Sequence, residues 1–123
     1  MCIRDRGIIV QKYGGTSLAS AKRIEAVAKY IHTCKQGGDD LIIVVSAMGN
    51  KTDELIKMAN EISTNPPSRE LDMLVSVGER MAMALLSIAL SKYDVPAISL
   101  TGSQSGILTT GDHGNADLSL IHI

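Results

Sequence analysis

The stretch IIVQKYGGTS, residues 8–17, decides how the rest of the chain is interpreted. Ile8 to Gln11 form a short β-branched run that predicts a strand, and the Gly14-Gly15 pair breaks it in a turn before a helix begins. Such a turn lets backbone amides approach an anion at the start of the helix. Lys12, at the end of the strand, adds a mobile positive charge that suits a phosphoryl group.

The glycine turn has neither the spacing of a P-loop nor the dinucleotide-binding fingerprint, so neither of those folds is supported. Glycine pairs also serve simply to make tight turns. The residues alone therefore leave a structural role open beside the phosphate-binding one.

The remaining chain alternates helical and strand patterns. Apolar residues recur at helical spacing from Ile24 to Cys34, and Gly37-Gly38 ends that helix. The apolar run 41–45 predicts a strand covered on both faces, and hence a parallel sheet. A second helix opens at Asp53 and Glu54 and ends before Pro66-Pro67.

Residues 68–92 keep helical spacing across Gly78, which predicts one long helix or two short ones. Residues 97–100 and 107–110 are predicted to be two further strands, separated by a loop rich in glycine and serine. This order predicts an α/β fold with a mainly parallel sheet, whose ligands gather at the carboxyl ends of the strands.

Composition excludes several classes of protein. The 123 residues carry a net charge of -1 and only three aromatic side chains, all Tyr, so nucleic acid is not an expected partner. The unbroken apolar stretches are too short to cross a membrane, and the N-terminal residues do not have the pattern of a secretory signal. Cys2 and Cys34 lack the spacing of a zinc or redox site and are interpreted as reduced thiols of a cytoplasmic protein.

Four segments together resemble a known family. The run QKYGGTS, residues 11–17, is similar to the N-terminal signature of aspartate kinases, which are members of the amino acid kinase family. VVSAMG at 44–49, SVGER at 76–80 and LTGSQSG at 100–106 agree with the same family in order and spacing. The resemblance covers residues 8–116 and implies a truncated three-layer αβα sandwich of the amino acid kinase type.

The activity implied by the resemblance is transfer of the γ-phosphoryl group of ATP to the side-chain carboxylate of L-aspartate. The product is 4-phospho-L-aspartate, and the step opens lysine, threonine and methionine biosynthesis. A carboxylate with a pKa of ~4 is already anionic at neutral pH, so the reaction needs no general base. It needs charge neutralisation, supplied by a lysine and by Mg²⁺ that the nucleotide carries.

The family motifs also imply roles for individual residues. Lys12 is the candidate catalytic residue and binds the phosphates together with Tyr13, Gly14 and Gly15. Ser46 and Thr52 are candidates for contacts to aspartate, although both residue types also cap helices without any ligand.

Glu79 is the candidate partner of the aspartate α-ammonium group. It lies on a helix face otherwise suited to burial, where an unpaired charge is costly, and its alternative is a solvated helix residue. We expect Arg80 to be a surface or structural residue. We expect His113 to position a loop rather than to bind a metal, and we predict no metal site.

The two ends do not match the family pattern, so residues 1–6 and 117–123 are interpreted as extraneous. Residues 7–116 are then the N-terminal half of an amino acid kinase domain. The adenine pocket and the regulatory ACT domains of the family are not in this sequence. We therefore expect the chain alone to be inactive, and the full-length protein to form a homo- or hetero-oligomer.

Two alternatives stay open. One is another member of the superfamily, acting on glutamate, acetylglutamate or UMP. These proteins share the first strand with its lysine and the glycine pair that follows. Tyr13, residues 46–48 and Glu79 favour aspartate. The other is a non-catalytic amino-acid-binding or dimerisation fragment, in which the long helix rich in Leu and Met forms an interface.

Overall fold

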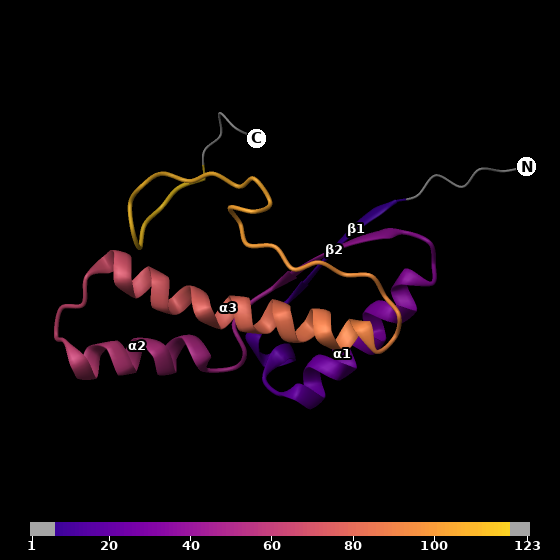
Figure 1. Cartoon of the computed structure of the whole chain (residues 1–123), viewed down its shortest axis with the longest axis horizontal. Helices are drawn as coiled ribbons and strands as arrows, with labels where there is room; N and C mark the ends of the chain where they lie inside the picture. The colour runs from indigo at the N-terminus through magenta and orange to yellow at the C-terminus, as the bar shows by residue number, and fades with distance from the viewer. Residues whose placement is uncertain (1–6, 119–123) are drawn as a thin grey trace, which may run out of the picture.

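A computed structural model of the chain describes residues 7–118. The elements follow the order β1 (Ile8–Tyr13), the short 3-10 helix η1 (Gly15–Leu18), α1 (Ala21–Lys35), β2 (Asp40–Val45), α2 (Lys51–Ile62) and α3 (Ser68–Ser91). Figure 1 shows α2 and the first half of α3 projecting as a hairpin to one side of the sheet, while α1 lies beneath the second half of α3.

The two strands pair in parallel, with Val10 opposite Ile42 and Lys12 opposite Val44. α1 connects them, as parallel pairing requires, because the chain must return to the starting edge of the sheet. The predicted α/β class and parallel sheet are therefore confirmed. The carboxyl ends of both strands lie at the same edge, and the loops that follow them meet there.

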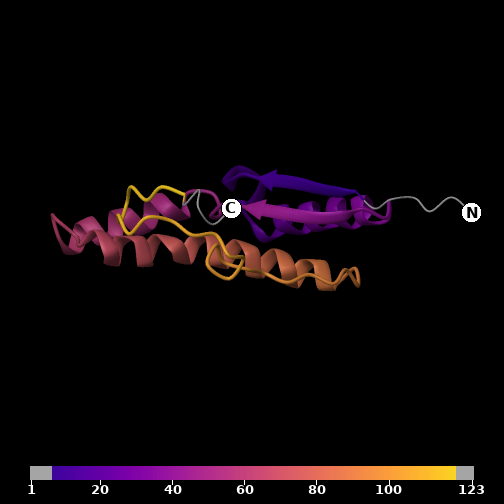
Figure 2. The same cartoon turned by 90° about the horizontal axis from the view of Figure 1, so that it is seen from above.

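One face of the sheet packs on the helices and the other does not. Leu41, Ile43 and Val45 pack against the helical core, whereas Ile42 and Val44 are 52% and 44% exposed on the opposite face. The prediction that both faces of this strand are covered is wrong for the part of the chain that is described, because α1 and α3, the helices that form its core, pack on the same face. In Figure 2 the strands lie above α3.

α1 and α3 form the core, into which η1 inserts Leu18. The buried cluster contains Leu18, Ile24, Val27, Ala28 and Ile31 together with Ala82, Leu86, Ala89 and Leu90. Ala28 and Ala82 are fully buried, and their small side chains let the two helices approach closely. Ser20 caps α1 by accepting a 3.3 Å hydrogen bond from the backbone N–H of Arg23.

α3 is a single helix that continues through Gly78. By length and apolar composition alone it is the one helix among residues 7–118 that could cross a membrane. Its buried residues, Gly78, Ala82, Leu86, Ala89 and Leu90, face α1 and the loop after β2, as in a core helix.

The two later strands that the sequence predicts do not form in the described chain. Residues 97–100 have no strand partner, and residues 107–110 make one isolated antiparallel bridge, between Thr109 and Leu118. A groove separates residues 97–100 from β2, so no ladder joins them. Apolar β-branched sequence favours a strand only where an edge is within hydrogen-bonding distance.

Candidate active site

Ala47 lies at the centre of a junction between three segments. A Cβ atom at Gly15 would lie 2.8 Å from the carbonyl oxygen of Ala47, and a Cβ atom at Gly78 would lie 2.9 Å from the Ala47 Cβ. Ala47 itself is only 6% exposed. The turn after β1 and the middle of α3 therefore both close on the loop after β2, and only glycine fits at either contact.

Two backbone hydrogen bonds join the same segments. The amide of Ser46 donates to the carbonyl oxygen of Tyr13 at 3.2 Å, and the amide of Gly49 donates to that of Gly15 at 2.9 Å. These bonds fix the end of β1 against the end of β2, and the contact between Gly78 and Ala47 adds the centre of α3. This is the edge of a parallel sheet at which ligands bind.

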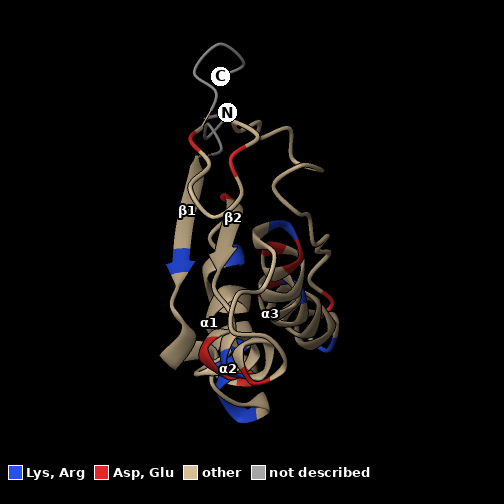
Figure 3. Cartoon of the chain, turned by 90° about the vertical axis from the view of Figure 1, so that its left-hand side faces the viewer, with Lys and Arg blue, Asp and Glu red and all other residues tan. Residues whose placement is uncertain are grey.

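Lys12 and Tyr13 lie on opposite faces of β1. Lys12 is exposed on the open face, and its ammonium group makes no ion pair within residues 7–118. Figure 3 shows the blue end of β1, where Lys12 stands, beside β2. Tyr13 packs against the core, donates to Gln11 Oε1 at 2.8 Å, and has a pKa raised mainly by burial. The Tyr13 side chain therefore points away from the open face on which Lys12 lies.

The amides of Gly14 and Gly15 donate to no acceptor among the described residues. Nothing lies within 4 Å of the position that a Cβ atom would take on Gly14, so its surroundings are open. Gly15 differs, because its close contact with Ala47 gives it a structural role as well. The pair is therefore both a turn and a source of two unpaired N–H donors.

Ser46 and Thr52 are half-buried, one at the end of β2 and the other in the first turn of α2. The N-cap of α2 is Asn50, so the alternative in which Thr52 caps this helix is wrong. Within residues 7–118 neither hydroxyl has a hydrogen-bond partner. Both are available to a ligand at the same edge of the sheet.

Glu79 does not lie on a buried face, which corrects the expectation from the sequence. It is exposed, and the buried face of α3 passes through its neighbour Gly78. One residue advances a helix by about 100°, so Glu79 turns out of the core and into a groove. The groove has a volume of about 880 Å³ and runs between α3, β2 and residues 95–107.

Glu79 is the one predicted site residue that lines this groove. Ser76, Arg80 and Met83 join it from α3, and Thr101, Gly102 and Ser105 face it from the coil. Arg80 makes no ion pair with a described residue, so it belongs to the groove wall rather than to a structural pair. Lys12, Ser46 and Thr52 stand outside the groove, linked to Glu79 through the Ala47 junction.

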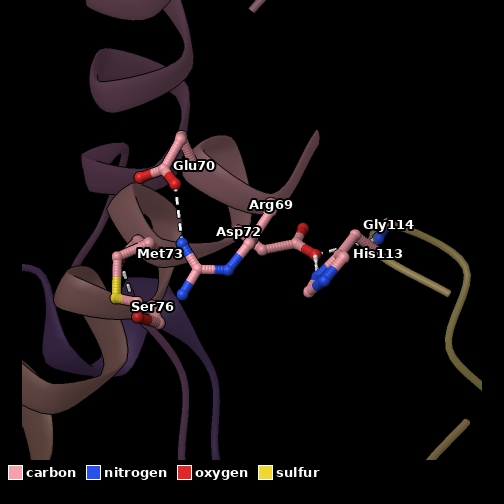
Figure 4. A network of polar contacts seen from close by, with 7 residues as sticks. All are labelled: Arg69, Glu70, Asp72, Met73, Ser76, His113 and Gly114. Carbon is pink, nitrogen blue, oxygen red and sulfur yellow. Dashed lines mark hydrogen bonds and ion pairs between the residues drawn. The ribbon is translucent and has the colours of Figure 1, made fainter. Parts of the chain in front are cut away.

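His113 has a partner far away in the sequence. Its Nδ1 lies 3.1 Å from Asp72 Oδ2, and the amide of Gly114 donates to the same oxygen at 3.0 Å (Figure 4). The contact confirms the predicted loop-positioning role. Across residues 7–118, no three His, Cys, Asp or Glu side chains are grouped to hold a metal ion.

The model of the amino acid kinase family matches residues 7–122 of this sequence. The chain belongs to the amino acid kinase family. The match continues beyond residue 116, into the C-terminal segment that was interpreted as extraneous. The origin of that segment stays a prediction, and residues 1–6 and 119–123 lie outside the described structure.

Curated relatives within the family are aspartokinases. The chain is 50% identical over 111 residues to the aspartokinase of Mycolicibacterium smegmatis, covering 90% of this chain and 26% of the relative. It is 52% identical over 110 residues to that of Geobacillus stearothermophilus, covering 89% and 27%. The crystal structure of aspartate kinase from Synechocystis superposes with a TM-score of 0.76 at 56% identity, covering 80% of this chain and 17% of that one.

The predicted resemblance to aspartate kinases is thus confirmed. The chain spans about a quarter of the length of the curated relatives that it matches.

Proposed function

We propose that this chain forms the aspartate-binding and phosphate-binding part of an ATP-dependent aspartate kinase. The junction at Ala47 carries this proposal, because it brings together the ends of β1 and β2 and the centre of α3. Those three segments bear Lys12, Ser46 and Glu79. The similarity to aspartokinases supports L-aspartate as the substrate in preference to glutamate, acetylglutamate or UMP.

The chemistry follows from charge. The bond between the γ-phosphorus of ATP and its bridging oxygen breaks, and an aspartate carboxylate oxygen forms a new bond to the same phosphorus. No proton moves, because the carboxylate is already ionised. Catalysis therefore consists of positioning two anions and neutralising their charge.

Lys12 has no ionic partner in the described chain, so its ammonium group can neutralise a phosphate without first leaving another carboxylate. The unpaired amides of Gly14 and Gly15 add two donors that suit phosphate oxygens. Mg²⁺ carried by the nucleotide would supply further charge neutralisation at the phosphates.

L-Aspartate carries a positive ammonium group and negative carboxylates, and each needs a partner in the binding site. The Glu79 carboxylate is exposed and unpaired within the described chain, which suits the α-ammonium group. The Ser46 and Thr52 hydroxyls are unpaired and able to donate to the substrate carboxylates. Binding by residues on three different segments would make affinity depend on their relative placement.

The test is a hybrid enzyme in which residues 7–116 of this chain replace the matching residues of the Mycolicibacterium smegmatis aspartokinase. Formation of the hydroxamate by hydroxylamine capture is measured with ATP and each of L-aspartate, L-glutamate and acetylglutamate, and UMP phosphorylation is followed in parallel. We expect product when L-aspartate is the acceptor and none with the other three acceptors. A folded hybrid that phosphorylates another substrate would overturn the assignment.

The unextended chain is expected to be inactive and to gain little thermal stability from aspartate. The proposal gives it only part of the groups that bind substrate, and stabilisation follows the affinity of the folded state.

An interface function is a second candidate, supported by one feature of α3. Five apolar residues recur along an exposed stripe of this helix, between 37% and 64% exposed: Met73, Val77, Met81, Leu85 and Ile88. Exposed apolar stripes of this kind form protein interfaces. Sedimentation of the chain beside a Val77→Glu, Met81→Glu variant tests it. A concentration-dependent dimer that the variant abolishes is expected, and a wild-type monomer at all concentrations would exclude it.

A further inference from the structure

Asp72 makes two contacts with a distant segment through one carboxylate oxygen. Oδ2 lies 3.1 Å from His113 Nδ1 and accepts the Gly114 amide at 3.0 Å. Figure 4 shows the side chain extending from α3 toward this segment. Two groups on adjacent residues converge on a single acceptor, so the contact fixes both the position and the orientation of the loop.

Within residues 7–118, these are the polar contacts that tie residues 101–118 to the body of the molecule. Every other described hydrogen bond of the segment is internal: Ile107 donates to Gly102, Thr110 donates to Asp117, and the Asp117 amide donates back to the Thr110 hydroxyl. These hydrogen bonds form two groups, one within residues 101–107 and one within residues 109–118, and no described hydrogen bond joins the two. Asp72 holds the second group, residues 109–118, against α3.

Asp72 and Glu79 share one face of α3. Seven residues are close to two helical turns, so the two carboxylates lie about 10 Å apart along the axis, with Ser76 between them. Residues Thr101, Gly102 and Ser105 line the groove opposite Ser76 and Glu79. Residues 109–118, which Asp72 holds, follow this wall directly in the chain.

We propose that Asp72 is a positioning residue for substrate binding, which holds residues 109–118 against α3 and thereby restrains the adjoining residues 101–107, the groove wall opposite Glu79. The inference rests on the proposed function for the identity of the ligand, L-aspartate. Asp72 does not touch the transferred phosphoryl group in this proposal. Its loss should weaken aspartate binding and leave the chemical step nearly unchanged.

The kinetic test uses the hybrid enzyme with Asp72→Ala, His113→Ala and Asp72→Asn. Removing one anchoring hydrogen-bond acceptor should raise the KM for aspartate by about threefold to tenfold, while kcat changes less than about twofold. Asp72→Asn keeps an acceptor oxygen for both donors and should recover most of the wild-type KM. Glu70→Ala is the matched control, because Glu70 is an exposed acid half a turn away that pairs with Arg69 at 2.7 Å on the same helix.

The structural test is hydrogen exchange on the 123-residue chain. Asp72→Ala should speed exchange of the amides in residues 107–118 and leave those of α1 unchanged. Should Asp72→Ala not fold, His113→Ala and Asp72→Asn carry both measurements.

An unchanged KM in Asp72→Ala, a fall in kcat with no change in KM, or unchanged exchange would each overturn the inference. If the unsubstituted hybrid shows no aspartate dependence, the proposed function fails instead. Exchange then still decides whether Asp72 holds the segment.

Discussion

Gly78 and Ala47 meet so closely that a Cβ atom on residue 78 would lie 2.9 Å from the Cβ of Ala47. The contact sets the distance between α3 and the end of β2, and it is where the helix carrying Glu79 meets the strand end carrying Ser46. A glycine in the middle of a helix costs about 1 kcal/mol relative to alanine. The close approach explains why that cost is tolerated here.

Gly78→Ala should therefore destabilise the chain even though alanine is the better helix former. Overpacking costs about 1–3 kcal/mol, and helix propensity returns about 1 kcal/mol, so a net loss of up to about 2 kcal/mol is expected in urea unfolding. Gly111→Ala is the control, because no atom lies within 4 Å of its added Cβ. Equal stability of the two variants would show that the Ala47 contact does not constrain α3.

The two glycines of the turn should respond differently to alanine. At Gly15 the added Cβ meets two backbone oxygens, of Ala47 at 2.8 Å and of Gly49 at 3.2 Å, which cannot move aside as a side chain can. Gly15→Ala should lower the unfolding free energy. Gly14→Ala should not, because its surroundings are open and its φ of -79° suits any residue.

If Gly14→Ala raises the KM for ATP in the hybrid enzyme without changing its stability, the substitution acts on nucleotide binding and not on folding. Equal destabilisation by both substitutions would contradict the geometry of the turn.

Neighbouring residues of β2 should differ sharply in their contribution to stability. Ile43 packs on the helical core, while Val44 is 44% exposed on the open face. Ile43→Ala should cost about 2 kcal/mol or more by leaving a cavity, and Val44→Ala should cost less than about 1 kcal/mol, as exposed substitutions do. Denaturant unfolding measures both, and the reverse order would mean that the register of β2 is wrong.

The ion pair between Glu25 of α1 and Lys92 after α3, at 2.9 Å, should make stability depend on pH. Its hydrogen bond lowers the pKa of Glu25 from 4.5 and raises the pKa of Lys92 from 10.5. A lowered carboxyl pKa stabilises the fold above pH 4.5 and is lost as pH falls through the lowered value. A raised lysine pKa stabilises below pH 10.5 and is lost as pH rises through the raised value.

Glu25→Gln should thus be slightly less stable than wild type at pH 7 and equal to it at pH 3. Because both groups are exposed, the difference at pH 7 should shrink in high salt. Urea midpoints at the two pH values measure it, and a difference that persists at pH 3 would assign the effect to something other than this pair.

Much of the fold could be predicted from local pattern. The helical spacing from Ile24 to Ile31, the glycine stop at 37–38 and the β-branched strands are local signals, and the structure confirms the elements that they predict. Local signals were not enough to decide whether residues 97–100 and 107–110 form strands. Whether such a stretch becomes a strand depends on a free edge within reach, which is not a local property.

For the candidate site, the sequence predicted on which elements several residues lie, but not how those elements are arranged. Lys12, Gly14 and Gly15 stand at a strand end, as the spacing indicates. The sequence predicts that Glu79 lies on a buried face of α3, because apolar residues surround it in the sequence. Only some of those residues belong to the buried face, and the others form an exposed stripe. Ala47 belongs to the VVSAMG motif, but nothing in the sequence predicts its contacts with Gly15 and Gly78, although a glycine inside a helix, as at residue 78, often marks a close contact.

The most direct measurement is aspartate-dependent hydroxamate formation by the hybrid enzyme, compared among wild type, Lys12→Ala, Lys12→Arg and Glu79→Gln. Lys12→Ala should lower kcat by at least about a hundredfold, and Lys12→Arg should recover part of it by restoring the charge. Glu79→Gln should raise the KM for aspartate by about tenfold or more, because it removes a charged partner of the ammonium group. Full activity of Lys12→Ala, or an unchanged KM in Glu79→Gln, would contradict the assignment of this chain as the substrate-binding part of an aspartate kinase.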